Sequence, residues 1–422
     1  MKILWITNTL FPDAAIALGK APPVVGGWMY GLAKDLSESN VTLTVATVTN
    51  FGKDEQVSVA GIQYYLLQSN KPKTFYDQSL VPKWQKLIET VAPDLVHIHG
   101  TEYAQGLSLL KAYPKMKHVI SIQGLIGVIA RYYTAGIPTK QIVKNITFRD
   151  VLKRDTILHA QSSFYKRARL VEKVYLQNAK HIIGRTQWDK DHISTMAPKA
   201  AYYHADESLR DIFYTSKKWD LNNAAPHTIF LSQAGYPIKG LHMVLKAVAL
   251  LKPFYPNLQV RIAGGNILMN DAGFKKKLKR KGYGKYIQSI IDTNDLEKNV
   301  SFLGFLKSEQ MVGEYLKSHV FICPSSIENS PNSVGEAQLL GVPTIASYVG
   351  GVPTFISDGE TGLLYRFEEV EMLASCMRKL FEDGDLTRSL SEKEIEVATK
   401  RHHRQNNCKR LVQVYDQILN VS

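Results

Sequence analysis

Long apolar runs and closely spaced cysteines are both missing from this chain of 422 residues. No stretch of 18 uninterrupted apolar residues occurs, so no membrane-spanning helix is predicted. Cys323, Cys376 and Cys408 lie far apart and have no metal-binding spacing, which indicates a reducing compartment. Residues 1–8 predict a strand and lack the apolar core and cleavage site of a signal peptide. We therefore expect a cytoplasmic protein.

Acidic side chains are also in short supply. The chain has 52 Lys and Arg against 38 Asp and Glu, a formal net charge of +14. The excess is concentrated in residues 111–200, which carry 17 basic and 5 acidic side chains. Such an imbalance indicates an anionic partner. A membrane surface, a lipid-phosphate acceptor and nucleic acid all fit, and so does a merely solvated basic face.

Strand-like apolar runs alternate with helical stretches along the whole chain. This alternation predicts parallel sheets covered by helices, and the length predicts two doubly wound domains of about 200 residues. We expect a first domain over 1–210, a second over 211–400 and a terminal helix within 401–422. The expected strands are 2–8, 41–48, 95–100, 118–123, 181–185, 228–232, 259–263, 300–304, 320–324, 344–347 and 362–365.

Two carboxylates eight residues apart, Glu328 and Glu336, lie in the most informative segment. A predicted strand, 320–324, precedes them, and a helical run follows. Ser330 is a good N-cap and Pro331 suits the first helical position. Because a helix N-terminus carries free N–H groups and partial positive charge, it favours phosphate. The segment therefore suits a sugar nucleotide, with the carboxylates holding hydroxyls and the helix start holding the diphosphate.

This segment resembles the E-x7-E signature of the retaining glycosyltransferases of family 4, the glycosyl transferases group 1, which have the GT-B fold. The resemblance continues through residues 341–344, 350–353 and 358–364. It implies an α/β fold of two doubly wound parallel-sheet, Rossmann-like domains that face each other across a cleft. The first domain would bind the acceptor and the second the nucleotide-sugar donor. The helix in 401–422 would cross back to the first domain.

The resemblance also assigns roles in the donor site. Glu336 would accept hydrogen bonds from the ribose hydroxyls, and Glu328 would contact the hydroxyls of the donor sugar. Lys239, a compact point charge, would neutralise the leaving diphosphate. The remaining donor contacts are expected from backbone N–H groups and from the loop beside the nucleobase, namely Asn332, Ser333, Val334 and Leu306.

The segment before Lys239 departs from the family pattern G-R-x-x-x-x-K-G. Gln233 or Ala234 stands where the family has an arginine, so one positive charge is missing. Another base, Arg185 or Arg210, would replace it, or the diphosphate would depend more on Lys239 and backbone N–H groups. Arg210 has an equally good alternative as an anchor of the interdomain linker. An inactive relative of the family remains a further alternative.

Two features of the first domain match the family. Gly26 and Gly27 follow the first predicted strand, where missing side chains let the backbone approach donor phosphates and acceptor, although a simple tight turn fits as well. His99 ends the strand 95–100, and alternation places His97 on the same side. A neutral imidazole of His99 could hydrogen-bond a sugar hydroxyl. The alternative is a purely structural histidine.

The expected function is a retaining glycosyltransferase that moves a sugar from a UDP- or GDP-sugar to a glycan or lipid-linked acceptor in surface polysaccharide or glycolipid synthesis. His99, Glu328 and Lys239 would be its catalytic residues. We expect no metal and no cofactor beyond the donor, and a peripheral contact with the anionic inner face of the plasma membrane. The alternatives are another GT-B sugar-nucleotide enzyme, such as a phosphorylase or an epimerase, and a basic nucleic-acid-binding protein.

Overall fold

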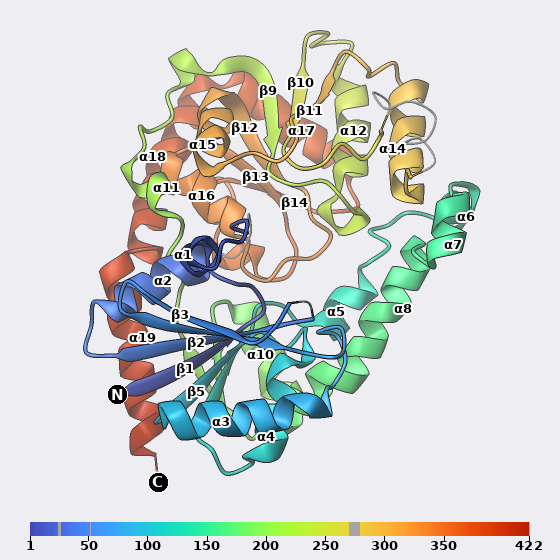
Figure 1. Cartoon of the computed structure of the whole chain (residues 1–422). Helices are drawn as coiled ribbons and strands as arrows, with labels where there is room; N and C mark the ends of the chain where they lie inside the picture. The colour runs from blue at the N-terminus through green and yellow to red at the C-terminus, as the bar shows by residue number, and fades with distance from the viewer. Residues whose placement is uncertain (24–26, 51, 270–278, 422) are drawn as a thin grey trace. The chain divides into compact units, whose positions relative to one another are not determined.

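The computed structural model describes residues 1–23, 27–50, 52–269 and 279–421 (Figure 1). The chain forms two compact units. Unit 1 consists of Met1–Gly127, Tyr165–Arg210 and His402–Ser422, and unit 2 of Val128–Phe164 and Asp211–Arg401. Within the described ranges, no helix is long and apolar enough to cross a bilayer.

Unit 1 is built on an eight-stranded sheet in the order β3-β4-β2-β1-β5-β6-β7-β8. Neighbouring strands are parallel, except that β3 pairs antiparallel with β4 at one edge. The strand order reverses between β1 and β5. The strands are β1 (Lys2–Thr7), β2 (Thr42–Thr49), β3 (Glu55–Val59), β4 (Ile62–Gln68), β5 (Leu95–His99), β6 (His118–Ser121), β7 (His181–Gly184) and β8 (Ala201–His204).

The helices of unit 1 include the last helix of the chain. α19 packs against α2 and buries an apolar stripe that contains Leu411 and Val414 in the core of this unit. The Tyr415 hydroxyl accepts a hydrogen bond of 2.9 Å from Trp5 Nε1 and lies 2.6 Å from His97 Nδ1, all of them buried. The helices are α1 (Pro12–Ala17), α2 (Gly27–Ser37), α3 (Val81–Val91), α4 (Leu107–Ala112), a π-helical turn (Ala168–Glu172), α9 (Lys173–Asn178), α10 (Gln187–Met196) and α19 (Arg404–Asn420).

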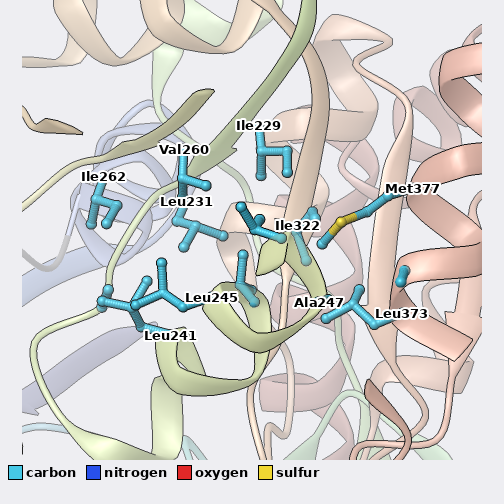
Figure 2. Packing of buried hydrophobic residues seen from close by; sticks show 14 of the residues in the cluster. Ile229, Leu231, Leu241, Leu245, Ala247, Val260, Ile262, Ile322, Leu373 and Met377 are labelled. Atoms are coloured by element: carbon cyan, nitrogen blue, oxygen red, sulfur yellow. The ribbon is translucent and has the colours of Figure 1, made fainter. Parts of the chain in front are cut away.

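Unit 2 is built on six parallel strands in the order β11-β10-β9-β12-β13-β14, which reverses between β9 and β12. Every residue of β12 is buried, as expected for a parallel strand covered on both faces. Figure 2 shows the core, where Ile229, Val260 and Ile322 meet helical side chains such as Leu245 and Met377. The strands are β9 (Ala225–Leu231), β10 (Gln259–Ile262), β11 (Val300–Phe302), β12 (Ser318–Cys323), β13 (Thr344–Ser347) and β14 (Leu363–Tyr365).

Helices α12 and α17 pack against each other over this core. The segment before β9 is also folded, because Trp219 is buried and its Nε1 donates a hydrogen bond of 2.8 Å to the Ser318 carbonyl. It is therefore part of unit 2. The helices are α11 (Asp211–Thr215), α12 (Leu241–Leu251), α14 (Gly282–Thr293), α15 (Ser308–Lys317), α16 (Asn332–Leu340), α17 (Val370–Glu382) and α18 (Gly384–Arg401).

Residues 128–164 group with unit 2, although they fall inside the expected first-domain range of 1–210. Ile137 and Ile142 are buried in the core of unit 2. His242 Nε2 lies 2.8 Å from the Ala135 carbonyl, and the Ser326 hydroxyl donates a 3.0 Å hydrogen bond to the Tyr132 carbonyl. The helices of this stretch are α5 (Ile126–Arg131), α6 (Thr139–Lys144), α7 (Phe148–Lys153) and α8 (Ile157–Arg167).

The expected fold class, two parallel-sheet α/β domains, is confirmed, and all eleven predicted strands are present with small shifts at their ends. β3, β4 and β8 were not predicted. The arrangement of the two domains across a cleft stays a prediction.

Candidate functional site

The candidate site of unit 2 lies where its strand order reverses. In open parallel sheets, ligands bind beyond the carboxyl ends of the strands at this point. β9 and β12 are neighbours and run parallel, so the loops that follow them, 232–240 and 324–331, leave the same edge of the sheet side by side. The first loop carries Lys239 and the second carries Glu328.

These two side chains form an ion pair. Lys239 Nζ lies 2.5 Å from Glu328 Oε1, and the Ser325 hydroxyl donates to the same oxygen at 2.8 Å. The two side chains are only 19% and 17% exposed. Burial opposes the charge of Lys239, but the adjacent Glu328 carboxylate outweighs it and raises the pKa of Lys239 above its usual value. The ammonium group therefore stays charged in a poorly hydrated place, where it can bind an anionic ligand strongly.

Gly240 fixes the position of the Lys239 loop. It has a φ of +67°, and a Cβ at this position would lie 1.7 Å from the Pro324 carbonyl oxygen. The Ser326 N–H also donates a 2.8 Å hydrogen bond to the Ile238 carbonyl. Only glycine permits this close approach, so the Lys-Gly pair brings the loop after β9 onto the loop after β12.

Gly350 and Gly351 hold the Glu328 loop from the other side. The Gly351 N–H donates to the Glu328 carbonyl at 2.9 Å. Gly350 has a φ of +52°, and its Cβ would lie 1.9 Å from the same carbonyl oxygen. These glycines follow β13, the strand next to β12. They act as a backbone support for Glu328.

Helix α16 follows the Glu328 loop and begins at Asn332, one residue later than the sequence suggested. Pro331 takes the N-cap position and Ser330 lies outside the helix. The N–H groups of Val334 and Gly335 donate to the Pro331 carbonyl at 2.9 and 3.3 Å. Asn332 is the first helical residue, so its N–H has no acceptor within the helix and can bind an anion.

Glu336 lies one turn further along α16 and is 6% exposed. The partly exposed residue Ser333 is on the first turn of the same helix. A short helix start thus carries a backbone anion site, and a carboxylate follows it by one turn. The diphosphate and ribose contacts expected of these residues stay predictions.

The loops after β10 and β11 are joined by a backbone bridge. The Gly264 N–H donates to the Gly304 carbonyl at 2.8 Å. Phe305 next to this bridge is 79% exposed, and Leu306 is partly buried. A flat aromatic ring beside glycines is suited to contact a planar base.

Neither candidate for the position of the family arginine, Gln233 or Ala234, carries a charge. Ala234 is 2% exposed and packs in the core of unit 2, whereas Gln233 is exposed. Of the two expected substitutes, Arg185 forms a buried ion pair with Glu207 inside unit 1. Arg210 is partly exposed and is the last residue of its segment of unit 1.

In unit 1 the order reverses between β1 and β5, and His99 ends β5. Its ring stacks on His97 at 3.9 Å and lies 4.3 Å from the ring of Trp5. Burial, with the neighbouring His97 and Arg185, lowers the pKa of His99 well below its usual value, so the imidazole is neutral. Gly27 is the first residue of α2, and Gly26 lies outside the described residues.

Two carboxylates near the end of β5, Glu102 and Glu172, were not predicted from the sequence. A Cβ on Gly100, which has a φ of +90°, would lie 2.2 Å from Glu102 Oε2. Glu172 accepts hydrogen bonds from the N–H groups of Ile126 and Gly127 at 2.5 and 3.0 Å. Burial raises the pKa of Glu102 and of Glu172 to about 7. Glu102 follows the end of a predicted strand, so its position in the sequence could have marked it as a site candidate. No sequence motif marks Glu172.

Metal ligands do not cluster in the part of the chain that the structure describes. No group of three or more His, Cys, Asp or Glu side chains there is placed to hold a metal ion.

Comparison with known proteins connects this geometry to a family. Residues 214–397 match the family model described as glycosyl transferases group 1. A D-inositol 3-phosphate glycosyltransferase of Corynebacterium urealyticum is 27% identical over 180 residues, which cover 42% of this chain and 40% of that relative. One from Corynebacterium jeikeium is 31% identical over 157 residues, which cover 37% and 35%. The matched stretches thus span less than half the length of these relatives.

Solved structures match the whole chain. Sucrose-phosphate synthase of Thermosynechococcus elongatus has a TM-score of 0.70 at 16% identity and covers 100% of both chains. HepE of Anabaena, solved with UDP-glucose, has a TM-score of 0.64 at 16% identity and covers 99% and 100%. WaaG, a glycosyltransferase involved in lipopolysaccharide biosynthesis, has a TM-score of 0.62 at 12% identity over 100% of both chains. The chain therefore has the fold of GT-B glycosyltransferases, and residues 214–397 match the glycosyl transferases group 1 family.

Proposed function

We propose that this protein is a retaining glycosyltransferase of family 4 that uses a nucleotide-sugar donor. The observation that carries the proposal is the Lys239–Glu328 pair at the reversal point of the second sheet. A charged lysine, a partly buried carboxylate and the start of α16 all lie after the carboxyl ends of β9 and β12. Lys239 and the start of α16 can bind the diphosphate, and the Glu328 carboxylate can bind the sugar hydroxyls.

The chemistry follows from where charge develops. As the bond between the anomeric carbon and the diphosphate breaks, negative charge grows on the leaving phosphate oxygens. Lys239 and the N–H groups at the start of α16, around Asn332 and Ser333, would stabilise that charge. The donor would draw Lys239 away from Glu328, whose carboxylate then becomes free to accept hydrogen bonds from sugar hydroxyls. Glu336 would hold the ribose.

The donor is proposed to be a UDP- or GDP-sugar and the acceptor a glycan or a lipid-linked sugar for surface polysaccharide or glycolipid synthesis. The structural relative HepE was solved with UDP-glucose, and WaaG is involved in lipopolysaccharide biosynthesis. In this proposal the domain over 211–400 binds the donor and the domain over 1–210 binds the acceptor. Gly26 and Gly27 would face the donor phosphates and the acceptor, and a neutral His99 would lie near the transferred sugar. Leu306 would lie beside the nucleobase, and Arg210 would be a further donor contact.

We further propose that transfer needs no divalent metal ion and takes place at a membrane. Lys239 would supply the positive charge that divalent metal ions supply in other diphosphate sites, so transfer should continue in the presence of EDTA. The basic residues between 111 and 200 would bring the enzyme to an anionic membrane, where lipid-linked acceptors reside.

The test begins with the donor. Purified protein is screened by thermal shift against UDP-, GDP- and ADP-sugars, because a ligand that binds the folded state raises its melting temperature. Slow hydrolysis of the best donor is then followed by NMR to identify which anomer is released first. Release of the donor's own anomer supports retention, and release of the opposite anomer refutes it. Failure of every sugar nucleotide to shift the melting temperature would contradict the proposed function itself.

A further inference from the structure

The short helix α7 presents its apolar face to solvent. Phe148, Val151 and Leu152 are 79%, 62% and 68% exposed, and their spacing places them on one side of the helix. Val143, on α6 just before, is 56% exposed. Large apolar side chains that are contiguous and exposed indicate an interaction surface.

The orientation of α7 is fixed by its opposite side. Asp150 is buried, forms a capping box with Thr147 and accepts a 2.8 Å hydrogen bond from the Gly282 N–H. The Thr147 hydroxyl donates to the Arg280 carbonyl at 3.1 Å. Because these contacts hold α7 to unit 2, the outward direction of Phe148 is part of the fold.

Exposed basic side chains flank the apolar residues along the chain. Lys140, Lys144, Lys153 and Arg154 are all exposed. Between residues 139 and 154 the only acidic side chain is Asp150, which is 1% exposed. The next residue, Asp155, is already paired with Arg149 and Lys281. The segment 139–154 therefore combines exposed apolar side chains with exposed positive charges.

We propose that this apolar–basic tip, formed by Val143, Phe148, Val151 and Leu152 with the four basic side chains, docks on an anionic lipid bilayer. Aromatic and aliphatic side chains enter the boundary between headgroups and acyl chains, while lysines and arginines bind anionic headgroups. The inference rests on the proposed function, which places the acceptor at a membrane, and it names the surface that makes the contact.

Other occupants fit this surface less well. A second copy docked face to face would bring the same four basic side chains together, and like charges repel. Nucleic acid would bind the lysines and could stack one base on Phe148, but phosphates do not favour contact with the aliphatic side chains Val143, Val151 and Leu152, which make up the rest of the apolar face. A bilayer satisfies both the positive charges and the apolar side chains.

The experiment uses the full chain in sedimentation with vesicles of phosphatidylcholine alone and with about one third phosphatidylglycerol. We expect binding to the anionic vesicles that weakens in salt but persists in part, because the apolar contacts are not screened. The double variant Phe148→Ser/Leu152→Ser should bind at least about tenfold more weakly. Lys144→Gln/Lys153→Gln should weaken binding mainly at low salt.

The chain offers a matched control. Leu250 and Phe254 are also an exposed apolar pair four residues apart, 47% and 68% exposed, but Phe254 lies near the Arg378–Glu382 ion pair rather than in a strongly basic segment. Leu250→Ser/Phe254→Ser should bind vesicles like the unaltered protein. Equal losses in the two double variants would overturn the assignment.

Three further results would overturn the proposal. They are equal sedimentation with neutral and anionic vesicles, unchanged binding by Phe148→Ser/Leu152→Ser, and a dimer in gel filtration that this variant dissociates. The donor-induced thermal shift is measured on the same samples without lipid. If the protein binds vesicles but no donor raises its melting temperature, only the proposed function is contradicted. If a donor raises the melting temperature but the protein does not bind vesicles, only the membrane-docking proposal is contradicted.

Discussion

Lys239 Nζ lies 2.5 Å from Glu328 Oε1, although 89 residues separate the two in the chain. The pair links the loops after two neighbouring parallel strands, β9 and β12. Both groups are expected to bind parts of one donor. Each side chain neutralises the charge of the other, so both charges are kept at low exposure where the two loops meet.

The first prediction concerns Lys239 itself. Lys239→Met should lower turnover about 100- to 1,000-fold, because it removes a charge aimed at the developing negative charge on the leaving group. It also leaves Glu328 without its cation, so some loss of stability is expected as well. Turnover is measured with saturating donor and acceptor.

Lys252→Met is the control for this variant. Lys252 follows α12 in the same unit and donates to the carbonyls of Asn294 and Asp295. The Lys252→Met substitution removes one positive charge, as Lys239→Met does, but away from the Lys239 loop. Its turnover should therefore stay near that of the unaltered protein. Full turnover by Lys239→Met would remove this lysine from the phosphate role.

The second prediction concerns nucleotide affinity. Glu336→Gln should weaken binding of the donor nucleotide about 10- to 100-fold, because a hydrogen bond to a charged acceptor is worth about 1.5–3 kcal/mol. Isothermal titration calorimetry with UDP and GDP measures this directly. The exposed Glu392 on α18 provides the matched Glu392→Gln control, which should titrate normally. Identical affinities for the two variants would exclude Glu336 from the nucleotide site.

The third prediction compares two glycines with positive φ, Gly350 and Gly359. An added methyl group would clash with a neighbouring atom only at Gly350. Gly350→Ala places a methyl group 1.9 Å from the Glu328 carbonyl, so it must displace the Glu328 loop and should abolish most activity. Gly359→Ala has a similar positive φ, +74°, but nothing within 4 Å of the added carbon. It should cost only the left-handed strain, about 1–2 kcal/mol of stability, and keep its activity. If the two variants lose activity equally, the Gly350 support is not needed.

The fourth prediction concerns pH. The pKa of Glu102 is raised to about 7 by burial, while that of a glutamate in the unfolded chain is about 4.3. Between these values the folded state binds more protons than the unfolded state, so this group makes stability fall as pH rises from about 4.5 to 7. Above pH 7 its unfavourable contribution is constant.

Glu102→Gln should therefore raise the thermal unfolding midpoint at pH 8, by up to a few degrees, and change it little at pH 5. Glu89→Gln, an exposed glutamate on α3 of the same unit, is the control and should change neither midpoint. The quantity to compare is the difference in unfolding midpoint between Glu102→Gln and the unaltered protein. A difference that is smaller at pH 8 than at pH 5 would contradict the raised pKa of Glu102. Circular dichroism across pH 5–8 measures the effect.

The regular elements could be predicted from sequence where the local signal was strong. The apolar run 320–323 forms most of β12, and the apolar stretch 241–251 forms α12. β3 and β4 lie at one edge of their sheet and β8 lies at the other edge. Edge strands mix polar with apolar residues because they are only partly buried, so periodicity does not distinguish them from loops.

The residues of the candidate site divide in the same way. Glu328, Glu336 and Lys239 belong to motifs with fixed spacing, so they could be named from the sequence. Glu172 could not, because it reaches the end of β5 only through the turn Ala168–Glu172 and its contacts with the N–H groups of α5. The placement of α7 depends on Asp150 meeting Gly282, which lies 132 residues away.

The sequence by itself determined which residues are ionisable, where eleven of the strands lie and where glycines permit a positive φ. These are local properties, set by side-chain chemistry and by the backbone over a few residues. Tertiary structure decided that Lys239 meets Glu328, that residues 128–164 join unit 2 and that Phe148 faces solvent. Such contacts depend on how strands are ordered and how helices pack over a shared core, and no local pattern contains that information.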